Sequence, residues 1–508
     1  MGELRFQVTA LGALPQHVVQ RAYLVSLEGI PWISHNSVED DVLVLSRDTS
    51  ESARLLIPWH VPGYGEYVLK TATLVERSRP YQLSLELARG TLHEIREYLA
   101  VHDGLDEPAE HPQAATLQEA LDTFVEAVTS VRDPARVNRL ADECLQLCIH
   151  WAQANSRQHA EQSVAVTQRR AGEIPTVFGV VLDDSQHPTS TPPAWHAAAN
   201  TLISPAVWRH MESQPAQRRW EQLDAQLDWA DRLGMSWGVG PLLSWTRESL
   251  PDWLSLWEED YETLQSHMVQ QVQAVVKRYR GRARFWHVVH RVNTAMGLNI
   301  TEQQRLELAA AAVDAARNVD RQTPILVSFE QPWHEYLALH RHEATPLDYA
   351  EALVRAKLGL GALGLEINLG YWPGGTGRRL PLEIDRVLSL WGRLGLPLVV
   401  FLAAPSDSTR DPMARSPVQP VTWGVDEPSG ESQATLIEQW CRLLMDHDSV
   451  WGVVWKQVSD QTLHELPHAG LLDATGRPKP LCNRLATLRA DLIPSPADRG
   501  PAGDTDQP

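Results

Sequence analysis

The last two-thirds of the chain alternates between short apolar runs and longer amphipathic segments. Each run ends in polar residues, and the segment after it repeats its apolar positions every three or four residues. Short buried strands that alternate with helices predict a parallel sheet, and eight repeats predict a closed (β/α)8 barrel over residues 174–490. The eight runs are Val177–Leu182, Asn200–Ile203, Met235–Gly240, Phe285–His290, Ile325–Phe329, Leu363–Ile367, Leu398–Leu402 and Val450–Trp455.

Residues 1–100 follow a different pattern. Short, partly alternating runs such as Leu4–Leu11, Val42–Leu45 and Tyr81–Leu87 are interrupted by Gly, Pro, Asp and Ser. Many short strands separated by turn residues are typical of β-sandwiches and jelly rolls. We therefore expect a separate β-rich domain at the start of the chain.

A helical segment is predicted between these two parts. Apolar residues recur at helical spacing in Thr91–Leu99, Leu117–Val131 and Val137–Ala152. We expect residues 101–173 to form a helical bridge between the domains. The last residues, 491–508, are rich in Pro, Gly and Asp and are expected to be disordered.

Composition narrows the classes of ligand and compartment. The net charge is −19, from 45 Lys and Arg against 64 Asp and Glu, which argues against nucleic acid and anionic membranes as partners. The sequence has neither a basic and apolar leader nor an apolar run of about 18 residues, so we expect a cytoplasmic protein. Its four Cys are too scattered for a disulfide framework, and Cys144, Cys148 and His150 lack the second ligand pair of a zinc site. We expect no metal and no cofactor.

The run that ends at His290 carries the most specific motif. Family 10 glycoside hydrolases, the retaining xylanases, have W-D-V-V-N-E at this strand, and the final Glu is their general acid/base. This chain reads Trp286-His287-Val288-Val289-His290-Arg291. Other fragments follow in the family's order: Ser204-Pro205, Leu250-Pro251, Val275-Val276, Gly395-Leu396-Pro397, Trp451-Gly452-Val453 and Pro478-Lys479-Pro480. The chain thus resembles family 10, and the resemblance implies a (β/α)8 barrel directed at an oligo- or polysaccharide.

The departures from the family fall on its catalytic positions. Arg291 stands at the acid/base, His290 at the Asn before it, and Leu402 at the nucleophile. A retaining glycosidase needs two carboxyl groups about 5–5.5 Å apart. Arg keeps its proton and Leu offers no nucleophile. The resemblance therefore favours a glycan-binding pseudoenzyme.

Two other carboxylates offer an alternative. Glu330 and Glu366 are expected at the ends of strands five and six, and adjacent strands lie roughly 4.8 Å apart, so both side chains would face one ligand as a relocated catalytic pair. The opposing interpretation pairs them with Arg291 or His290 in a polar plug that fills the old cleft. A buried carboxylate beside Arg has a lowered pKa, which disfavours a general acid.

Aromatic and polar residues complete the set of predicted ligand contacts. Large aromatic rings with flat faces suit sugar stacking, and polar groups near the strand ends suit hydroxyl recognition. The predicted ligand-binding residues are Arg209, Trp245, His290, Arg291, Trp333, Asn368 and Trp372, with Asp183 and Glu335 as further carboxylates. An open groove lined by these Trp residues would favour a sugar ligand. A mouth closed by salt bridges of Arg291 would instead favour an interaction protein without one.

Overall fold

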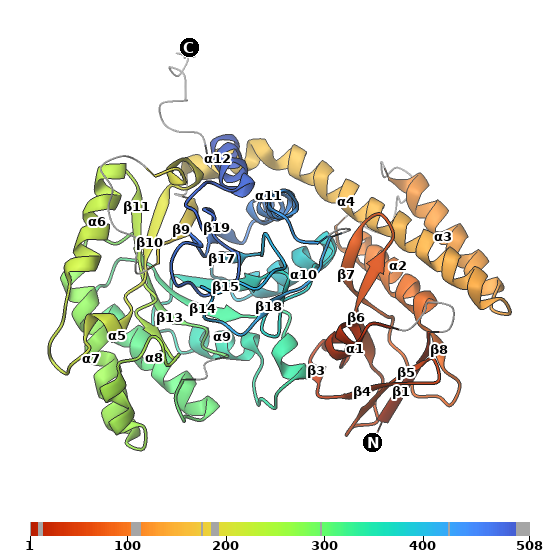
Figure 1. Ribbon diagram of the computed structural model, residues 1–508, viewed down its shortest axis with the longest axis horizontal. Helices are drawn as coiled ribbons and strands as arrows, with labels where there is room; N and C mark the ends of the chain where they lie inside the picture. The colour runs from red at the N-terminus through yellow and green to blue at the C-terminus, as the bar shows by residue number, and fades with distance from the viewer. Residues whose placement is uncertain are drawn as a thin grey trace, which may run out of the picture.

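The computed structural model describes residues 2–8, 14–102, 113–173, 176–183, 193–294, 297–424 and 427–493, with the side chains of 160–173 left out. A β-rich domain, red in Figure 1, lies at one end of the molecule and a barrel, green to blue, lies at the other. One long helix, α4 (Pro134–Glu173), runs across both. No helix within the described ranges is long and apolar enough to cross a bilayer.

Eight parallel strands form the barrel, as the alternating pattern predicts. Each strand pairs with the next along the chain, and the eighth pairs with the first, so the sheet closes. The observed bounds lie within two residues of those expected, which confirms the (β/α)8 fold. The strands are β9 (Val177–Val181), β10 (Thr201–Ser204), β11 (Ser236–Val239), β13 (Phe285–His290), β14 (Ile325–Glu330), β15 (Ala362–Asn368), β17 (Leu398–Ala403) and β19 (Val450–Trp455).

Helices cover the outside of the barrel. Three of them, α8, α9 and α11, begin at capping boxes on Thr301, Thr345 and Ser429, which satisfy backbone N–H groups that the first turn leaves free. The barrel helices are α5 (Trp208–Met211), α6 (Glu221–Leu233), α7 (Tyr261–Tyr279), α8 (Glu302–Val319), α9 (Pro346–Arg355), α10 (Pro381–Gly392), α11 (Gly430–Asp446) and α12 (Pro480–Leu492), and the shorter elements are η1 (His196–Ala198), β12 (Leu243–Ser244), η2 (Asp252–Trp257), η3 (Glu335–Ala338), β16 (Tyr371–Trp372) and β18 (Gln419–Pro420).

The N-terminal domain contains two four-stranded sheets around one apolar core. One sheet has the order β4-β5-β1-β8 and the other β3-β2-β6-β7. The elements are β1 (Gly2–Gln7), α1 (Gln16–Arg21), β2 (Tyr23–Val25), β3 (Pro31–Trp32), β4 (His35–Glu39), β5 (Val42–Arg47), β6 (Arg54–Val61), β7 (Gly65–Lys70) and β8 (Tyr81–Gln82).

The expected strand Tyr81–Leu87 is wrong beyond its first two residues. Only Tyr81–Gln82 pairs with β1, and helix α2 (Leu83–His102) starts directly afterwards. Leu83 and Leu87 fit alternation, but they also fit helical spacing, and both are fully buried on the inner face of the helix. The packing of both residues in the core of the N-terminal domain selects the helix.

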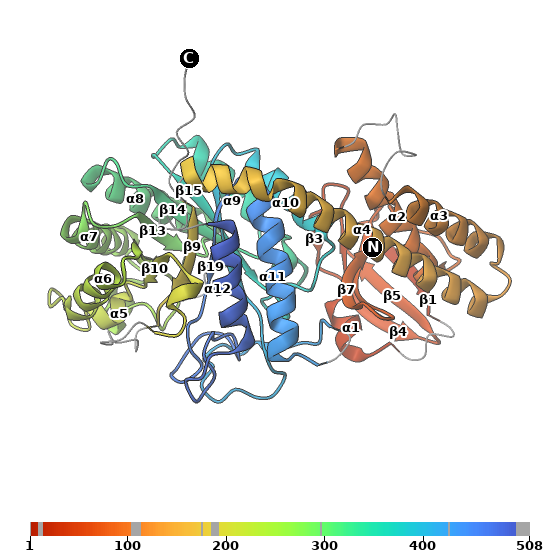
Figure 2. The same ribbon diagram turned by 90° about the horizontal axis from the view of Figure 1, so that it is seen from above.

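The helical segment lies against both domains. Helices α3 (Ala114–Thr129) and α4 pack on α2, and α4 then crosses α10, α11 and α12 of the barrel (Figure 2). Residues 103–112 of the predicted bridge, and residues 494–508 of the predicted tail, lie outside the described residues. Residues 491 and 492 belong to α12.

Candidate functional site

The carboxyl ends of the central barrel strands bring the predicted site residues together. Strands β14 and β15 pair in a register that sets Glu330 directly beside Glu366. His290 ends β13, and Lys456 follows the last residue of β19. In a parallel barrel these ends meet at one face, where ligands bind in barrel enzymes. The chain thus places charged groups from four strands at one mouth.

Glu366 lies at the centre of this network and is almost completely buried, with 1% exposure. One carboxylate oxygen accepts from Arg291 Nε and Lys456 Nζ, each at 2.9 Å. The other accepts from Ser328 Oγ at 2.7 Å and lies 2.8 Å from His290 Nε2. Four partners use the acceptor sites of a carboxylate, which leaves none for a ligand.

The surrounding cations keep Glu366 ionised. Burial alone would raise the pKa of Glu366, but the charges of His290, Lys456 and Arg291 outweigh it and hold that pKa well below its ordinary value. Burial would likewise lower the pKa of Arg291, yet the facing carboxylates raise it well above the usual range. A general acid must carry a proton near neutral pH, so Glu366 does not fit that role.

Glu330 is also held by several groups. Its two carboxylate oxygens accept from Asn368 Nδ2 at 2.8 Å and from Thr294 Oγ1 at 2.9 Å. Arg291 Nε lies 3.4 Å away. The backbone N–H of Glu330 donates to Asn293 Oδ1, and Asn293 Nδ2 donates back to its carbonyl. Both members of the predicted carboxylate pair therefore lie together, and each has partners within the protein.

Arg291 bridges the mouth from one side to the other. Its φ of 51° lies in the left-handed region, which a non-glycine residue adopts only at some cost. From this position its side chain contacts Glu366, Glu330 and Glu465, the last from the loop after β19. Burial raises the pKa of Glu465, but Arg291 and Lys456 outweigh it and lower that pKa to about 2. The salt bridges of Arg291 thus span the barrel mouth and join carboxylates on both of its sides.

A second histidine supports the network from below. His287 on β13 is buried, and its Nε2 lies 3.0 Å from Ser328 Oγ, the same hydroxyl that donates to Glu366. Burial lowers the pKa of His287 to about 3, with the nearby His290 adding to the effect. His287 is therefore neutral, and it positions the serine without adding charge.

The predicted aromatic contacts do not form one exposed groove. Trp245 is buried to 1% exposure. Trp333 is half-buried, with its ring edge-on to Trp440 and the Arg379 guanidinium 5.4 Å from its centre. Trp372, on β16, is also half-buried. The rings predicted for sugar stacking are mostly occupied by packing within the protein.

The remaining candidates lie outside the network. Arg209 donates to both carboxylate oxygens of Asp252 and to the carbonyls of Arg247 and Leu250, so it fixes the loop before η2. Asp183, after β9, accepts from Thr462 Oγ1 at 3.4 Å. Glu335 lies in η3, where it pairs with Arg379 at 2.8 Å.

Several members of the network were not predicted from the sequence. Lys456 directly follows β19, and residues at the ends of other strands were chosen as candidates for this reason, so the same rule could have found it. Ser328 and His287 lie inside strands, where a polar residue among apolar neighbours was the available signal. Glu465 lies in a long loop, and nothing in the sequence indicates that this loop returns to the mouth.

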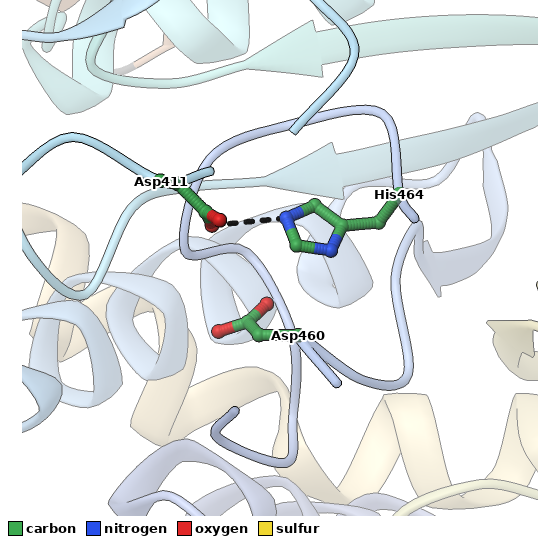
Figure 3. A group of neighbouring side chains, drawn as sticks. All are labelled: Asp411, Asp460 and His464. Carbon is green, nitrogen blue, oxygen red and sulfur yellow. Dashed lines mark hydrogen bonds and ion pairs between the residues drawn. The ribbon is translucent and has the colours of Figure 1, made fainter. Parts of the chain in front are cut away.

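Another polar cluster lies beside the mouth, formed by Asp411, Asp460 and His464 (Figure 3). Their potential ligand atoms lie within 4.8 Å of one another. His464 Nε2 lies 2.9 Å from Asp411, and its Nδ1 lies 2.7 Å from the Thr462 carbonyl, so neither nitrogen presents a free lone pair. Lys479 Nζ contacts Asp460 and supplies the positive charge that a metal would bring. The cluster is satisfied by protein groups and does not fit a metal site.

Comparison with known proteins confirms the similarity indicated by the sequence. Residues 178–309, from β9 into α8, match the model of glycosyl hydrolase family 10. This stretch includes Arg291 but ends before Leu402, so it covers one of the two positions at which the family's catalytic residues are expected. A search of curated proteins finds no match.

Several solved xylanase structures are similar to this chain. The native xylanase 10B from Thermotoga maritima has 14% sequence identity, covers 64% of this chain and 98% of its own length, and gives a TM-score of 0.48. The corresponding values for xylanase B from Clostridium stercorarium F9 are 17%, 63%, 98% and 0.46. Those for the Thermobacillus composti GH10 xylanase are 19%, 63%, 99% and 0.46.

Proposed function

We propose that this xylanase-like barrel does not hydrolyse glycosides and that the protein acts by binding. The observation that carries this proposal is the environment of Glu366. The carboxylate has four protein partners and is kept ionised by buried cations. A retaining mechanism needs one protonated and one ionised carboxyl group on either side of the scissile bond. The pair Glu330 and Glu366 offers no such division of roles, because both are neighbours in one salt-bridged network.

The salt-bridged mouth favours an interaction or scaffold protein among the binding functions. Arg291 joins carboxylates on both sides of the mouth, and separating these pairs to admit a sugar chain would strand buried charges. Helix α3 and the turn after it expose Val125, Val128 and Val131 at helical spacing, at the end of the molecule far from the barrel (Figure 1). This apolar row is the surface on which we expect a protein partner to bind.

A glycan-binding pseudoenzyme is the second candidate. It is favoured by the family match and by Trp372, which is half-buried and retains part of its ring surface for stacking. Such a protein would bind a sugar chain at the rim of the mouth rather than inside it.

Affinity electrophoresis separates the two candidates. The protein is run through gels that contain xylan, mannan or β-glucan and through a sugar-free gel. An interaction protein is expected to migrate equally in all of them, because Arg291 and its carboxylate partners occupy the mouth. A glycan-binding barrel would be retarded in at least one gel, and Trp372→Ala would abolish that retardation. An aromatic contact contributes about 0.5–1.5 kcal/mol, which is a large part of the binding energy of a weak ligand.

Trp257→Ala is the matched control. Trp257 is another partly exposed tryptophan, in η2 between β12 and α7, where its ring contacts His267, and among the described residues it has no contact with the mouth network. Retardation lost equally in both variants would indicate a general effect on folding. Retardation that survives in Trp257→Ala but not in Trp372→Ala would overturn the proposal of an interaction protein and favour a glycan-binding pseudoenzyme.

A further inference from the structure

A cavity lies away from the barrel mouth, between helices α4, α10 and α11. Figure 2 shows α4 crossing the other two helices. Its volume is about 430 Å³, within the range of roughly 300–1,000 Å³ typical of small-molecule sites. The residues that matter for its chemistry are Gln153, Arg157, Arg378, Arg379, Glu438 and Arg442.

The lining of this cavity is strongly basic in an acidic protein. Four arginines face one glutamate among its lining residues, whereas the whole chain has a net charge of −19. Glu438 is already paired with Arg442 at 2.9 Å. A local concentration of positive charge with low-dielectric walls attracts an anion and raises its local concentration.

Two of the arginines have no carboxylate partner in the described part of the chain. Arg157 projects from α4 and makes no ion pair there. Arg378 donates to the Tyr64 carbonyl at 2.9 Å and lies over the Tyr67 ring, 4.3 Å from its centre, but it has no counter-ion among the described residues. Burial lowers the pKa of Arg378, the direction expected for a guanidinium that lacks an opposite charge.

The third arginine is buried with unused donors. Arg379 is 2% exposed, and its Nη2 donates to Tyr23 and Glu335. Its Nε and Nη1 have no hydrogen-bond partner. Buried donors without partners are rare in folded proteins, because each costs free energy unless a ligand or water satisfies it. Tyr23 and Glu335 do not line this cavity but line another pocket together with Arg379, so Arg379 adds positive charge beside the cavity rather than a direct contact to its ligand.

We infer that the cavity between α4, α10 and α11 binds a small organic oxyanion, held chiefly by Arg157 and Arg378. Guanidinium groups bind carboxylates and phosphates through paired N–H donors. Gln153, which donates to the Tyr67 hydroxyl, lies beside them as a neutral polar group for the rest of the ligand. The inference is independent of what the barrel mouth does.

Isothermal titration calorimetry tests this site with the full chain. The probes are glucose 6-phosphate, glucuronate and uncharged glucose, at one ionic strength set with NaCl. We expect saturable binding of at least one anion and none of glucose. Binding of the phosphate alone or of the carboxylate alone would identify which oxyanion the site prefers. No saturable heat from either anion at millimolar concentration would overturn the proposal.

Arg157→Gln and Arg139→Gln form the matched pair of variants. Both residues are exposed on α4, so neither change should disturb folding, but Arg139 lies 18 positions earlier and roughly 27 Å away along the helix. Arg157→Gln is expected to weaken anion binding about tenfold, the usual effect of losing one charge-assisted hydrogen bond. Arg139→Gln should leave the affinity unchanged. Equal affinity in both variants would show that the anion binds elsewhere and would refute the assignment.

Discussion

Replacing Glu366 with glutamine is expected to destabilise the protein by roughly 3 kcal/mol, because the change leaves buried cations without their counter-ion. Lys456 and His290 lose their closest carboxylate, at 2.9 and 2.8 Å. Arg291 keeps Glu330 and Glu465, which holds the loss to the lower end of the range for a broken buried pair. Urea unfolding followed by circular dichroism measures the change.

This result distinguishes a structural carboxylate from a catalytic one. Active-site residues are often strained, so neutralising them tends to leave stability unchanged or to raise it. Glu351→Gln is the control: this carboxylate on α9 is 43% exposed and pairs with the exposed Arg355 outside the network, so its loss should cost less than about 1 kcal/mol. If Glu366→Gln is as stable as the parent protein, the cations around Glu366 do not depend on it, and the proposed plug fails.

Replacing Lys70 with methionine should weaken the contact between the two domains by about 3–5 kcal/mol, the usual cost of leaving a buried charge unpaired. Lys70 on β7 contacts Glu94 on α2 and Glu383 on α10, so one ammonium group joins three parts of the chain. Urea unfolding measures the loss. Lys277→Met, an exposed change on α7, should stay within about 0.5 kcal/mol of the parent. An equal effect of both changes would contradict the role of Lys70.

The same cluster predicts a pH dependence. Burial, and then the charge of Glu383, raises the pKa of Glu94 well above its ordinary value. Burial also acts to raise the pKa of Glu383, but Lys70 outweighs it and lowers that pKa. The two carboxyl groups therefore share one proton opposite one ammonium group.

The sign for Glu94 follows from its raised pKa. Its contribution to stability is complete below the unfolded value near 4.5 and is lost as the pH rises through the folded value. Glu94→Gln has no titrating group at this position. As the pH rises from about 5, the parent protein should therefore lose stability relative to the variant, by at most about 1.4 kcal/mol per pH unit. Glu97→Gln, exposed on the same helix, should track the parent protein. A difference that does not change with pH would contradict a shared proton.

The fold was predictable where a single period dominates. The run Phe285–His290 is apolar apart from His287 and ends in a polar residue, which is typical of a buried parallel strand. Leu83 and Leu87 satisfy two periods at once, and only their packing inside the N-terminal core selects the helix. The choice between strand and helix in Tyr81–Leu87 thus depends on tertiary contacts that the local sequence does not contain.

The site was predictable in part for a geometric reason. Residues near the carboxyl ends of parallel strands meet at one face, so Arg291, Glu330 and Glu366 could be placed together before their contacts were known. Their pairing follows from charge and burial. Glu465 could not be placed, because the path of its loop depends on contacts distant in sequence. The packing of Trp245 and Trp333 was equally hidden, since the sequence does not separate a core tryptophan from an exposed one.

Release of reducing ends from xylan, mannan and β-glucan is the measurement that tests the central claim most directly. The parent protein is incubated with each polysaccharide beside Glu366→Gln and Glu330→Gln. We expect no release by any of the three, because the buried cations hold Glu366 ionised and Arg291 spans the mouth. Release by the parent protein that either substitution abolishes would establish a working carboxylate pair and contradict the account.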